Sequence, residues 1–390
     1  MFIKNVMNEY EKRENAITRH LAGEKITSIV NSLGKSRRWF YNWLERYETA
    51  NGQGDWFADQ SRAPKTKPAK VPESVERKVL EARKHLEKQR MAQTGAIAIS
   101  YELRRQGIDP PPVWTINRII ARHGLNKTEP RRKSDKEYPE LFIHSHQMDL
   151  VGPRWLKGHG RFYSVNIIDT CSRSCSVEPV RSKASAGIVR SIANFWTSHG
   201  IPDALQMDNE LAFRGSNRYP RSFGIVVRFV LALGVTPVFI PVKEPWRNGI
   251  IEQFNRTYDK RFYRSVPFDD FKHLRRASRE FSAFHNAQHR YSSLNHQTPD
   301  QIHQQLGPYQ FYDHRFNLAE KILLQEGSIY FVRFIRSDLK LHLPTESFQV
   351  HENLKYSYVV AEISIENQCL LIQQNNEVIQ SFEYRMPVDW

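Results

Sequence analysis

Apolar residues near the N-terminus recur at helical spacing and predict three helices over residues 8–48. In the last of these helices the positions i, i+3, i+4 and i+7 are apolar or aromatic, and we expect them to be buried: Phe40, Trp43, Leu44 and Tyr47. Gly34 permits a tight turn before this helix, and Ser36 can cap its N-terminus. Two helices joined by a glycine turn form a helix-turn-helix arrangement, so we interpret residues 1–50 as a DNA-binding unit.

The polar side chains of the last helix are candidates for contacts with DNA: Arg37, Arg38 and Asn42. In a helix-turn-helix unit the second helix enters the major groove, which would bring such side chains to the bases. The alternative interpretation is a three-helix bundle with a purely structural role.

A basic linker and a second helical segment follow. Gly, Pro and Lys interrupt the periodicity over residues 51–72, whereas residues 73–127 are again amphipathic. In "VWTINRIIARHGL" one face is apolar: Val113, Ile116, Ile119 and Ile120. Trp114 and Arg118 lie on the opposite face, and a proline-rich turn precedes the helix. We interpret this segment as a second helix-turn-helix unit, with these two side chains facing DNA.

From about residue 138 the pattern changes to strands. The segments "ELFIHSHQMDLV", "RFYSVNIIDTCSR" and "SCSVEPVRS" are typical of three consecutive strands, after which helices and strands alternate. This order predicts an α/β core with a mixed sheet over residues 138–265. Residues 266–320 are predicted to be a helical extension, and the alternation over residues 321–390 predicts a small antiparallel β-barrel. The predicted fold class is therefore multidomain.

The formal net charge of +15 is unevenly distributed. Residues 1–137 contain 28 Lys and Arg against 17 Asp and Glu, whereas the remaining 253 residues contribute a net charge of only +4. This asymmetry indicates a polyanion-binding N-terminal part, although a solubilising surface would give the same count. With three cysteines, no secretory signal and no membrane-length apolar run, we expect a cytoplasmic, nucleoid-associated protein.

Three acidic residues stand in contexts that favour metal chemistry. Asp149 and Asp208 lie within or at the end of predicted strands, and Glu252 lies near the start of a predicted helix. Ligands of an open α/β sheet gather at the carboxyl ends of its strands. Carboxylates from separate elements suit hard divalent cations such as Mg²⁺, and two such ions can promote in-line phosphoryl transfer. The three acids therefore predict a catalytic centre that acts on nucleic acid.

A series of ordered motifs makes the chain resemble bacterial insertion-sequence transposases of the DDE/retroviral-integrase superfamily. The N-terminal motifs are "YNWLERYETANGQGDWFADQSRAPKTKPAKVP" and "GAIAISYELRRQGI…WTINRIIARHGL". The core motifs are "HQMDLVGP", "IIDTCSR", "MDNELAF" and "IPVKEPWRNGIIEQFNRTY", followed by "FHNAQHRYSSLNHQTPDQ". The resemblance covers nearly the whole chain.

This resemblance implies an RNase H-like catalytic core and a DDE triad of Asp149, Asp208 and Glu252 as the metal ligands. It implies two Mg²⁺ ions, for which Mn²⁺ can substitute, and a reaction in which water cleaves the element end and the freed 3′-hydroxyl attacks target DNA. It also implies double-stranded DNA partners, the terminal repeats and the target, and a homo-oligomer that holds two ends together. No covalent protein–DNA intermediate is needed.

The third acid has a competitor in the sequence. Thirty-five residues separate Asp208 from Glu244, the interval common in the superfamily, whereas 43 separate it from Glu252. We choose Glu252 because it stands three residues after Asn248-Gly249, in the family's Asn-Gly-x-x-Glu pattern, whereas Glu244 directly precedes a proline. The polar segment Arg214–Arg221 can absorb the extra length.

Further contacts with DNA are expected around the third acid: Trp246, Arg247, Asn248, Arg256 and Lys260. For the last two a solvated surface is the alternative, and Glu252 could instead be a surface acid paired with Arg256 four residues later. The histidines and cysteines form no compact set of four zinc ligands: His144, His146, Cys171 and Cys175. Asp169 is expected to fix a turn after its strand rather than to bind metal.

The leading hypothesis is a DNA transposase that binds the ends of an insertion sequence and catalyses Mg²⁺-dependent end cleavage and strand transfer. One alternative is a DNA-binding regulator that keeps an inactive core as a scaffold. Another is a metal-dependent nuclease that hydrolyses DNA without joining it. The sequence contains no Gly-rich phosphate loop with a following Lys, so any ATPase activity would come from a separate protein.

Overall fold

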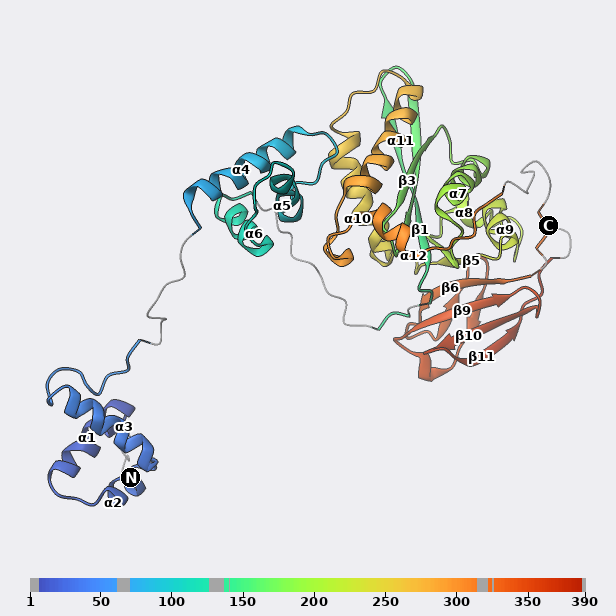
Figure 1. The fold of residues 1–390 in the computed structure, drawn as a ribbon. Helices are drawn as coiled ribbons and strands as arrows, with labels where there is room; N and C mark the ends of the chain where they lie inside the picture. Colours follow the sequence, from blue (N-terminus) through green and yellow to red (C-terminus); the bar gives the residue numbers. More distant parts are fainter. Residues whose placement is uncertain are drawn as a thin grey trace. The chain divides into compact units, whose positions relative to one another are not determined.

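The computed structural model describes residues 7–61, 71–125, 137–139, 141–313, 322–324 and 326–387. The chain divides into two compact units, Met1–Lys70 and Val71–Trp390 (Figure 1). Residues 62–70 of the expected linker, the end of the second helical segment and part of residues 266–320 lie outside the described residues. Within the described ranges, no helix is both long and apolar enough to span a bilayer.

The first unit contains three helices, as the spacing of apolar residues predicted: α1 Glu9–Leu21, α2 Ile26–Leu33 and α3 Arg37–Thr49. Gly34 takes the left-handed conformation (φ 64°, ψ 37°) that ends α2, and the Ser36 hydroxyl accepts a hydrogen bond from the Trp39 amide at 3.1 Å. Phe40 and Trp43 are buried in a small core, while Leu44 and Tyr47 pack at its edge. The predicted turn and cap are confirmed.

Three further helices begin the second unit: α4 Glu73–Lys88, α5 Ala96–Arg105 and α6 Val113–Arg122. Their shared core buries the apolar face of α6 that the sequence indicated, with Val113 half-buried at its edge. The turn before α5 contacts the end of α11, because the Gln93 side chain bonds the backbone N and O of Arg290 at 2.7 and 3.1 Å.

The central sheet begins with a three-stranded antiparallel meander and continues with two parallel strands: β1 Ser145–Leu156, β2 Gly160–Asp169, β3 Cys175–Val180, β4 Ala204–Met207 and β5 Thr236–Phe239. β4 pairs parallel with β1, and β5 pairs parallel with β4. The mixed sheet predicted from the order of elements is therefore confirmed.

Helices cover both faces of this sheet (Figure 1). One face packs against α7 Ser185–His199 and α9 Ile225–Ala232, and the short α8 Leu211–Arg214 follows β4. The other face packs against α10 Gly249–Tyr258 and α11 Phe271–Gln288. The remaining helical segments are 3₁₀ turns at Pro245–Asn248 and Ser292–Leu294, a π-helical turn at Asp259–Tyr263, and α12 Pro299–Leu306.

The C-terminal strands belong to the same sheet. They are β6 Ser328–Phe334, β9 Tyr358–Ser364, β10 Cys369–Gln374 and β11 Glu377–Glu383, with a small hairpin of β7 Lys340–His342 and β8 Ser347–Gln349 and a 3₁₀ turn at Glu352–Leu354 between β6 and β9. β6 pairs parallel with β5, which gives the strand order β11-β10-β9-β6-β5-β4-β1-β2-β3.

The small β-barrel expected over residues 321–390 is not confirmed as a separate body, because β6 joins the central sheet through β5. The strands of this region extend an open sheet, and we call β6, β9, β10 and β11 the C-terminal strands. Phe331 of β6 stacks on Phe239 of β5 with ring centroids 4.8 Å apart, so a continuous core crosses the junction. Alternation of apolar and polar residues is the same in a barrel and in an open sheet, and it carries no information about which edge a strand joins.

Candidate catalytic site

Asp149 and Asp208 are brought to the same level of the sheet by strand pairing. Gln147 of β1 pairs with Gln206 of β4 in parallel register. Each aspartate lies two residues beyond its glutamine, and side chains alternate with a period of two along a strand. The two carboxylates therefore lie side by side, on the same face, at the carboxyl end of β4.

The first turn of α10 is fixed to this part of the sheet by side-chain amides. The backbone N–H of Ile251 donates to Oε1 of Gln147 at 3.0 Å, and Nδ2 of Asn248 donates to the backbone O of Met148 at 3.1 Å. Nε2 of Gln206 donates to Oδ1 of Asn248 at 3.1 Å. The helix therefore starts at a defined point above β1 and β4, and its first turn carries Glu252.

Asn255 connects this helix directly to the first acid. Its Nδ2 donates to Oδ2 of Asp149 at 2.6 Å, while its Oδ1 accepts from Nδ2 of Asn166 at 2.7 Å. Glu252 lies three residues before Asn255 and so shares its face of the helix, toward Asp149. Sequence reasoning missed Asn255, although its spacing from Glu252 was a usable signal.

The electrostatics agree with a convergence of three carboxylates. Burial, and after it repulsion from Asp208, raises the pKa of Asp149 to about 6, and Glu252 adds to this repulsion. Burial also raises the pKa of Asp208, against the opposing effect of the Glu210 N–H, which donates to its Oδ1 at 2.9 Å. Two half-buried carboxylates that repel each other form an arrangement that a divalent cation would stabilise.

Glu244 has a different environment from the three acids. Its carboxylate accepts a hydrogen bond from the Tyr358 hydroxyl at 2.7 Å and pairs with Arg247 at 3.2 Å. No ion pair joins Glu252 to Arg256 in the part of the chain that the structure describes. The competitor acid is thus part of a contact with the C-terminal strands, whereas Glu252 is close enough to Asp149 to help raise its pKa.

The extra length between the second and third acids is held in a closed loop. The backbone N–H of Gly224 donates to the O of Arg214 at 2.9 Å, and a Cβ on Gly215 would lie 2.5 Å from the Gly224 nitrogen. The eight residues 216–223 between these glycines form the loop, and eight is also the difference between the two candidate intervals, 43 and 35 residues. The loop could therefore be inserted without displacing its flanking elements.

The expected DNA contacts near Glu252 fall into two groups. Trp246 is 56% exposed, and Arg256 on α10 and Lys260 in the π-helical turn after it are also exposed. Asn248, in contrast, is 4% exposed, with its amide used to fix α10. Arg247 is also largely covered, since it pairs with Glu244 and packs over two tyrosine rings. In this structure Asn248 and Arg247 thus contact neighbouring parts of the protein, and their expected contacts with DNA stay a prediction.

The N-terminal candidates are on the surface of their helices. Arg37, Arg38 and Asn42 are exposed on α3, where Arg37 donates to the Thr27 hydroxyl at 3.0 Å. On α6, Trp114 is 61% exposed, and the Arg118 guanidinium lies 5.7 Å from its ring centroid. These side chains are accessible to a partner, and their role in DNA binding remains a prediction.

His144, His146 and Asp169 form a second cluster, whose possible metal-ligating atoms lie within 4.8 Å of one another. The indole N–H of Trp196 donates to Nδ1 of His146 at 3.0 Å, so the neutral imidazole carries its own proton on Nε2. A metal ion at Nε2 would require the loss of that proton or of the indole hydrogen bond. Burial lowers the pKa of His146 to about 3, and we assign no metal to this cluster.

The cysteines do not complete this cluster. Sγ of Cys175 lies 2.9 Å from Nδ1 of His285 in a buried contact with α11. Asp169 accepts hydrogen bonds from the Cys171 amide at 2.8 Å and the Ser172 hydroxyl at 2.5 Å, so it fixes the turn after β2. The expectation that Asp169 fixes this turn is confirmed.

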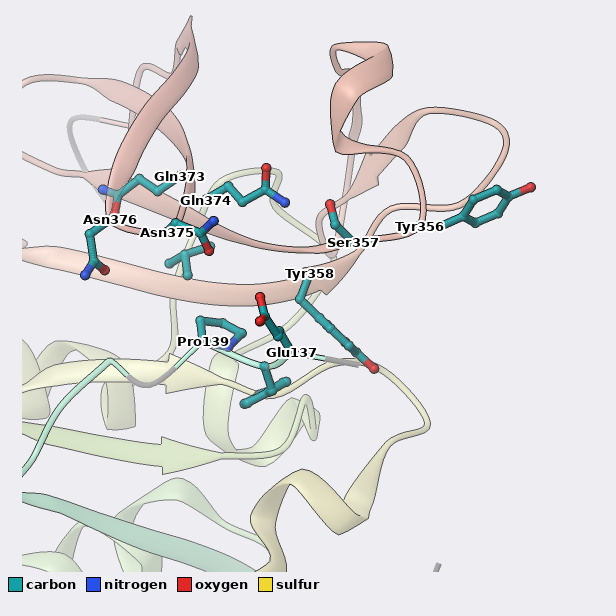
Figure 2. Close-up of a pocket in the computed structure, with 11 residues that line it drawn as sticks. Glu137, Pro139, Tyr356, Ser357, Tyr358, Gln373, Gln374, Asn375 and Asn376 are labelled. Carbon is teal, nitrogen blue, oxygen red and sulfur yellow. The ribbon is translucent and has the colours of Figure 1, made fainter. Parts of the chain in front are cut away.

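A pocket of about 530 Å³ lies on the C-terminal strands, where β9, β10 and residues 137–139 meet (Figure 2). Its lining is mainly aromatic and amide side chains, among them Tyr356, Tyr358, Gln373, Gln374 and Asn376. None of the three acids lines it, and neither does any Lys or Arg. This pocket is therefore separate from the candidate catalytic site.

Comparison with known proteins gives a family match to one segment. Residues 233–299 match the family described as an integrase core domain. Among solved structures, the magnesium complex of the HTLV-2 integrase catalytic core domain, in its dimeric form, is 18% identical, covers 42% of this chain and 97% of its own, and has a TM-score of 0.30. A simian T-cell lymphotropic virus intasome in complex with PP2A regulatory subunit B56 gamma is 14% identical, with coverages of 75% and 93% and a TM-score of 0.35.

The catalytic core domain of BIV integrase is 15% identical, with coverages of 42% and 94% and a TM-score of 0.30. The matched segment contains β5, the turn Pro245–Asn248, α10 and α11, and it includes Glu252. The part of the chain that carries the third candidate acid is thus similar in sequence to an integrase core domain.

Proposed function

We propose that the protein is a DNA transposase that cleaves the ends of an insertion sequence and joins them to target DNA. The observation that carries this proposal is the convergence of Asp149, Asp208 and Glu252 from two strands and a helix. The integrase core match over residues 233–299 supports the same reaction class, polynucleotidyl transfer.

The three acids fit magnesium. The set contains only oxygen donors, which hard divalent cations prefer, and Asp149 and Asp208 are half-buried without an ion-pair partner among the described residues. Two bound Mg²⁺ ions, or Mn²⁺ in their place, would activate the attacking oxygen and stabilise the leaving one.

The other residues of the site orient the acids and receive the DNA. Asn255 and the Leu150 N–H, at 2.6 and 2.8 Å, each hold one oxygen of Asp149, so the carboxylate has a fixed direction. The N-terminus of α10 points its partial positive charge toward the same region. Arg256 on α10 and Lys260 in the π-helical turn that follows are exposed, so both can bind phosphates of the DNA backbone.

The two N-terminal helical segments would recognise the element ends. The turn between α2 and α3 and the exposed side chains of α3 are suited to the major groove, and Trp114 and Arg118 on α6 offer a second contact. Because strand transfer joins two ends, we propose a homo-oligomer on double-stranded DNA.

Strand transfer with purified protein tests the proposal. Asp149→Asn and Asp208→Asn should bind end DNA with affinity close to that of the wild type and fail to cleave or join it in Mg²⁺. Strand transfer by either variant at the wild-type rate would refute the assignment. Metal-dependent hydrolysis without joined products would instead favour the nuclease, and binding without cleavage by the wild type would favour the regulator.

A further inference from the structure

A buried arginine of the C-terminal strands reaches the loop that carries the second acid. Arg333 on β6 is 5% exposed, and its guanidinium donates to Oδ1 of Asn209 at 2.7 Å. The same group donates to the backbone O of Ile240 at 3.0 Å and of His342 at 2.9 Å. Arg333 thus links the residue after Asp208 to the ends of β5 and β7.

Asn209 is held at three atoms. Its Oδ1 accepts from Arg333, and its Nδ2 donates to the backbone O of Ile240 at 2.6 Å. Its backbone O accepts from Nε of Arg214 at 3.0 Å. The next amide in the chain, the N–H of Glu210, donates to Oδ1 of Asp208 at 2.9 Å. Fixing Asn209 therefore fixes the peptide that orients the Asp208 carboxylate.

Burying the charged side chain of Arg333 costs free energy of folding, which points to a functional reason for its position. Among the described residues all its hydrogen-bond acceptors are neutral, and burying a cation without a carboxylate partner is unfavourable. Burial lowers the pKa of Arg333 to about 10, so the side chain is still protonated at neutral pH. All three nitrogens of the planar guanidinium donate hydrogen bonds, to acceptors on different segments, a geometry that the single ammonium of a lysine does not reproduce.

We propose that Arg333 is a positioning residue for Asp208, so that the C-terminal strands form a working part of the catalytic centre. This inference rests on the proposed metal-dependent function of the three acids. A second contact points the same way, since Tyr358 of β9 holds Glu244 at the start of the turn that leads into α10. The C-terminal strands thus contact both the Asp208 loop and the segment before Glu252.

The chain offers a matched control for the loss of a buried arginine. Arg228 on α9 is 7% exposed and donates to the backbone O of Phe223 at 2.9 Å and of Ile322 at 3.0 Å. These acceptors belong to no part of the candidate catalytic site. Arg228→Met should therefore lower stability without affecting the three acids.

The test measures Mn²⁺ binding to the full-length protein by isothermal titration calorimetry, together with the Mg²⁺ dependence of strand transfer. For Arg333→Met we expect a Kd for Mn²⁺ roughly tenfold higher than that of the wild type and a matching rise in the Mg²⁺ concentration for half-maximal transfer. Arg333→Lys should show a smaller rise. Arg228→Met should keep the Kd within about twofold of the wild type while it lowers Tm. Asn209→Ala should raise the Kd for Mn²⁺ as Arg333→Met does. The double variant should have the same Kd as Asn209→Ala alone, because both changes remove the same contact.

Unchanged Mn²⁺ binding by folded Arg333→Met would overturn the inference. If that variant does not fold, Arg333→Lys and Asn209→Ala decide, and an unchanged Kd in both would overturn it equally. If Arg228→Met raised the Kd for Mn²⁺ by the same factor, the weaker binding of Arg333→Met would be explained by general destabilisation, and the inference would fail. A wild type that binds Mn²⁺ but joins no DNA would refute the transposase function alone, because the Kd measurements would still test Arg333.

Discussion

Replacing Asp149 by asparagine should stabilise the metal-free protein at neutral pH. In the folded chain the pKa of Asp149 is about 6, against an ordinary value of 3.8, because the carboxylate is buried and faces Asp208 and Glu252. This difference corresponds to about 3 kcal/mol that folding must supply to keep Asp149 ionised. Asparagine removes the charge but cannot accept from both the Leu150 N–H and Asn255, which costs about 1 kcal/mol.

The expected net gain for Asp149→Asn is thus about 2 kcal/mol, or about 4 °C in Tm. The sign of the pH dependence follows from the raised pKa. Well below pH 3.8 the carboxyl is protonated in both states and the gain is absent, whereas the gain grows as pH rises from about 4 to 6 and is complete above this range. Magnesium should reverse the order, because it stabilises the wild type and not the variant.

Thermal unfolding in EDTA at pH 7.5 and pH 4, and again in excess Mg²⁺ at pH 7.5, measures these differences. Asp109→Asn is the matched control, since Asp109 is exposed and lies outside the site. A variant no more stable than the wild type in EDTA at pH 7.5 would refute the electrostatic reasoning. A gain of the same size at pH 4 would refute it as well, because the gain would then not come from the charge.

Three further predictions concern the site and the sheet. Phe331→Ala should destabilise the second unit by about 3–5 kcal/mol in urea unfolding, because this ring is fully buried at the junction of β5 and β6; a loss below about 1 kcal/mol would mean that the C-terminal strands fold independently. Glu252→Gln should abolish strand transfer, whereas Glu244→Gln should retain it, and the reverse result in a transfer assay would reassign the third acid. Asn255→Ala should lower the transfer rate about 10–100-fold with little change in DNA affinity by gel shift, and an unchanged rate would show that the bond to Asp149 is dispensable.

The elements around the acids were predictable because their patterns are local. Helical spacing, the glycine turn and the serine cap of the first unit each depend on a few neighbouring residues, and all appear in the structure. The order of strands and helices from β1 to α10 likewise follows from periods of two and 3.6. With the carboxyl ends of the strands as the expected site, this order was enough to nominate Asp149 and Asp208.

Long-range contacts were not predictable from the same patterns. Asn248 and Arg247 are residue types that often contact DNA. In the structure, however, Asn248 fixes the start of α10 and the Arg247 guanidinium packs over the ring of Tyr358. Tyr358 follows Arg247 by more than a hundred residues, and no periodicity connects the two. For the same reason an arginine in an alternating strand, Arg333, gave no sign that it would be buried against Asn209.

The way in which β6 joins β5 predicts that residues 138–265 do not fold as a self-contained core. The face of the sheet that carries Asp149 is covered partly by α10 and partly by Leu274, Ala277 and Phe281 of α11, which all lie beyond residue 265. The edge of β5 is hydrogen-bonded by β6, and Arg333 of β6 supplies hydrogen bonds at the carboxyl end of β5. A segment cut at residue 265 would expose an apolar face and leave a strand edge unpaired, both of which favour aggregation over folding. The three candidate acids are therefore held by a structure that extends through the C-terminal strands, as the proposed positioning role of Arg333 requires.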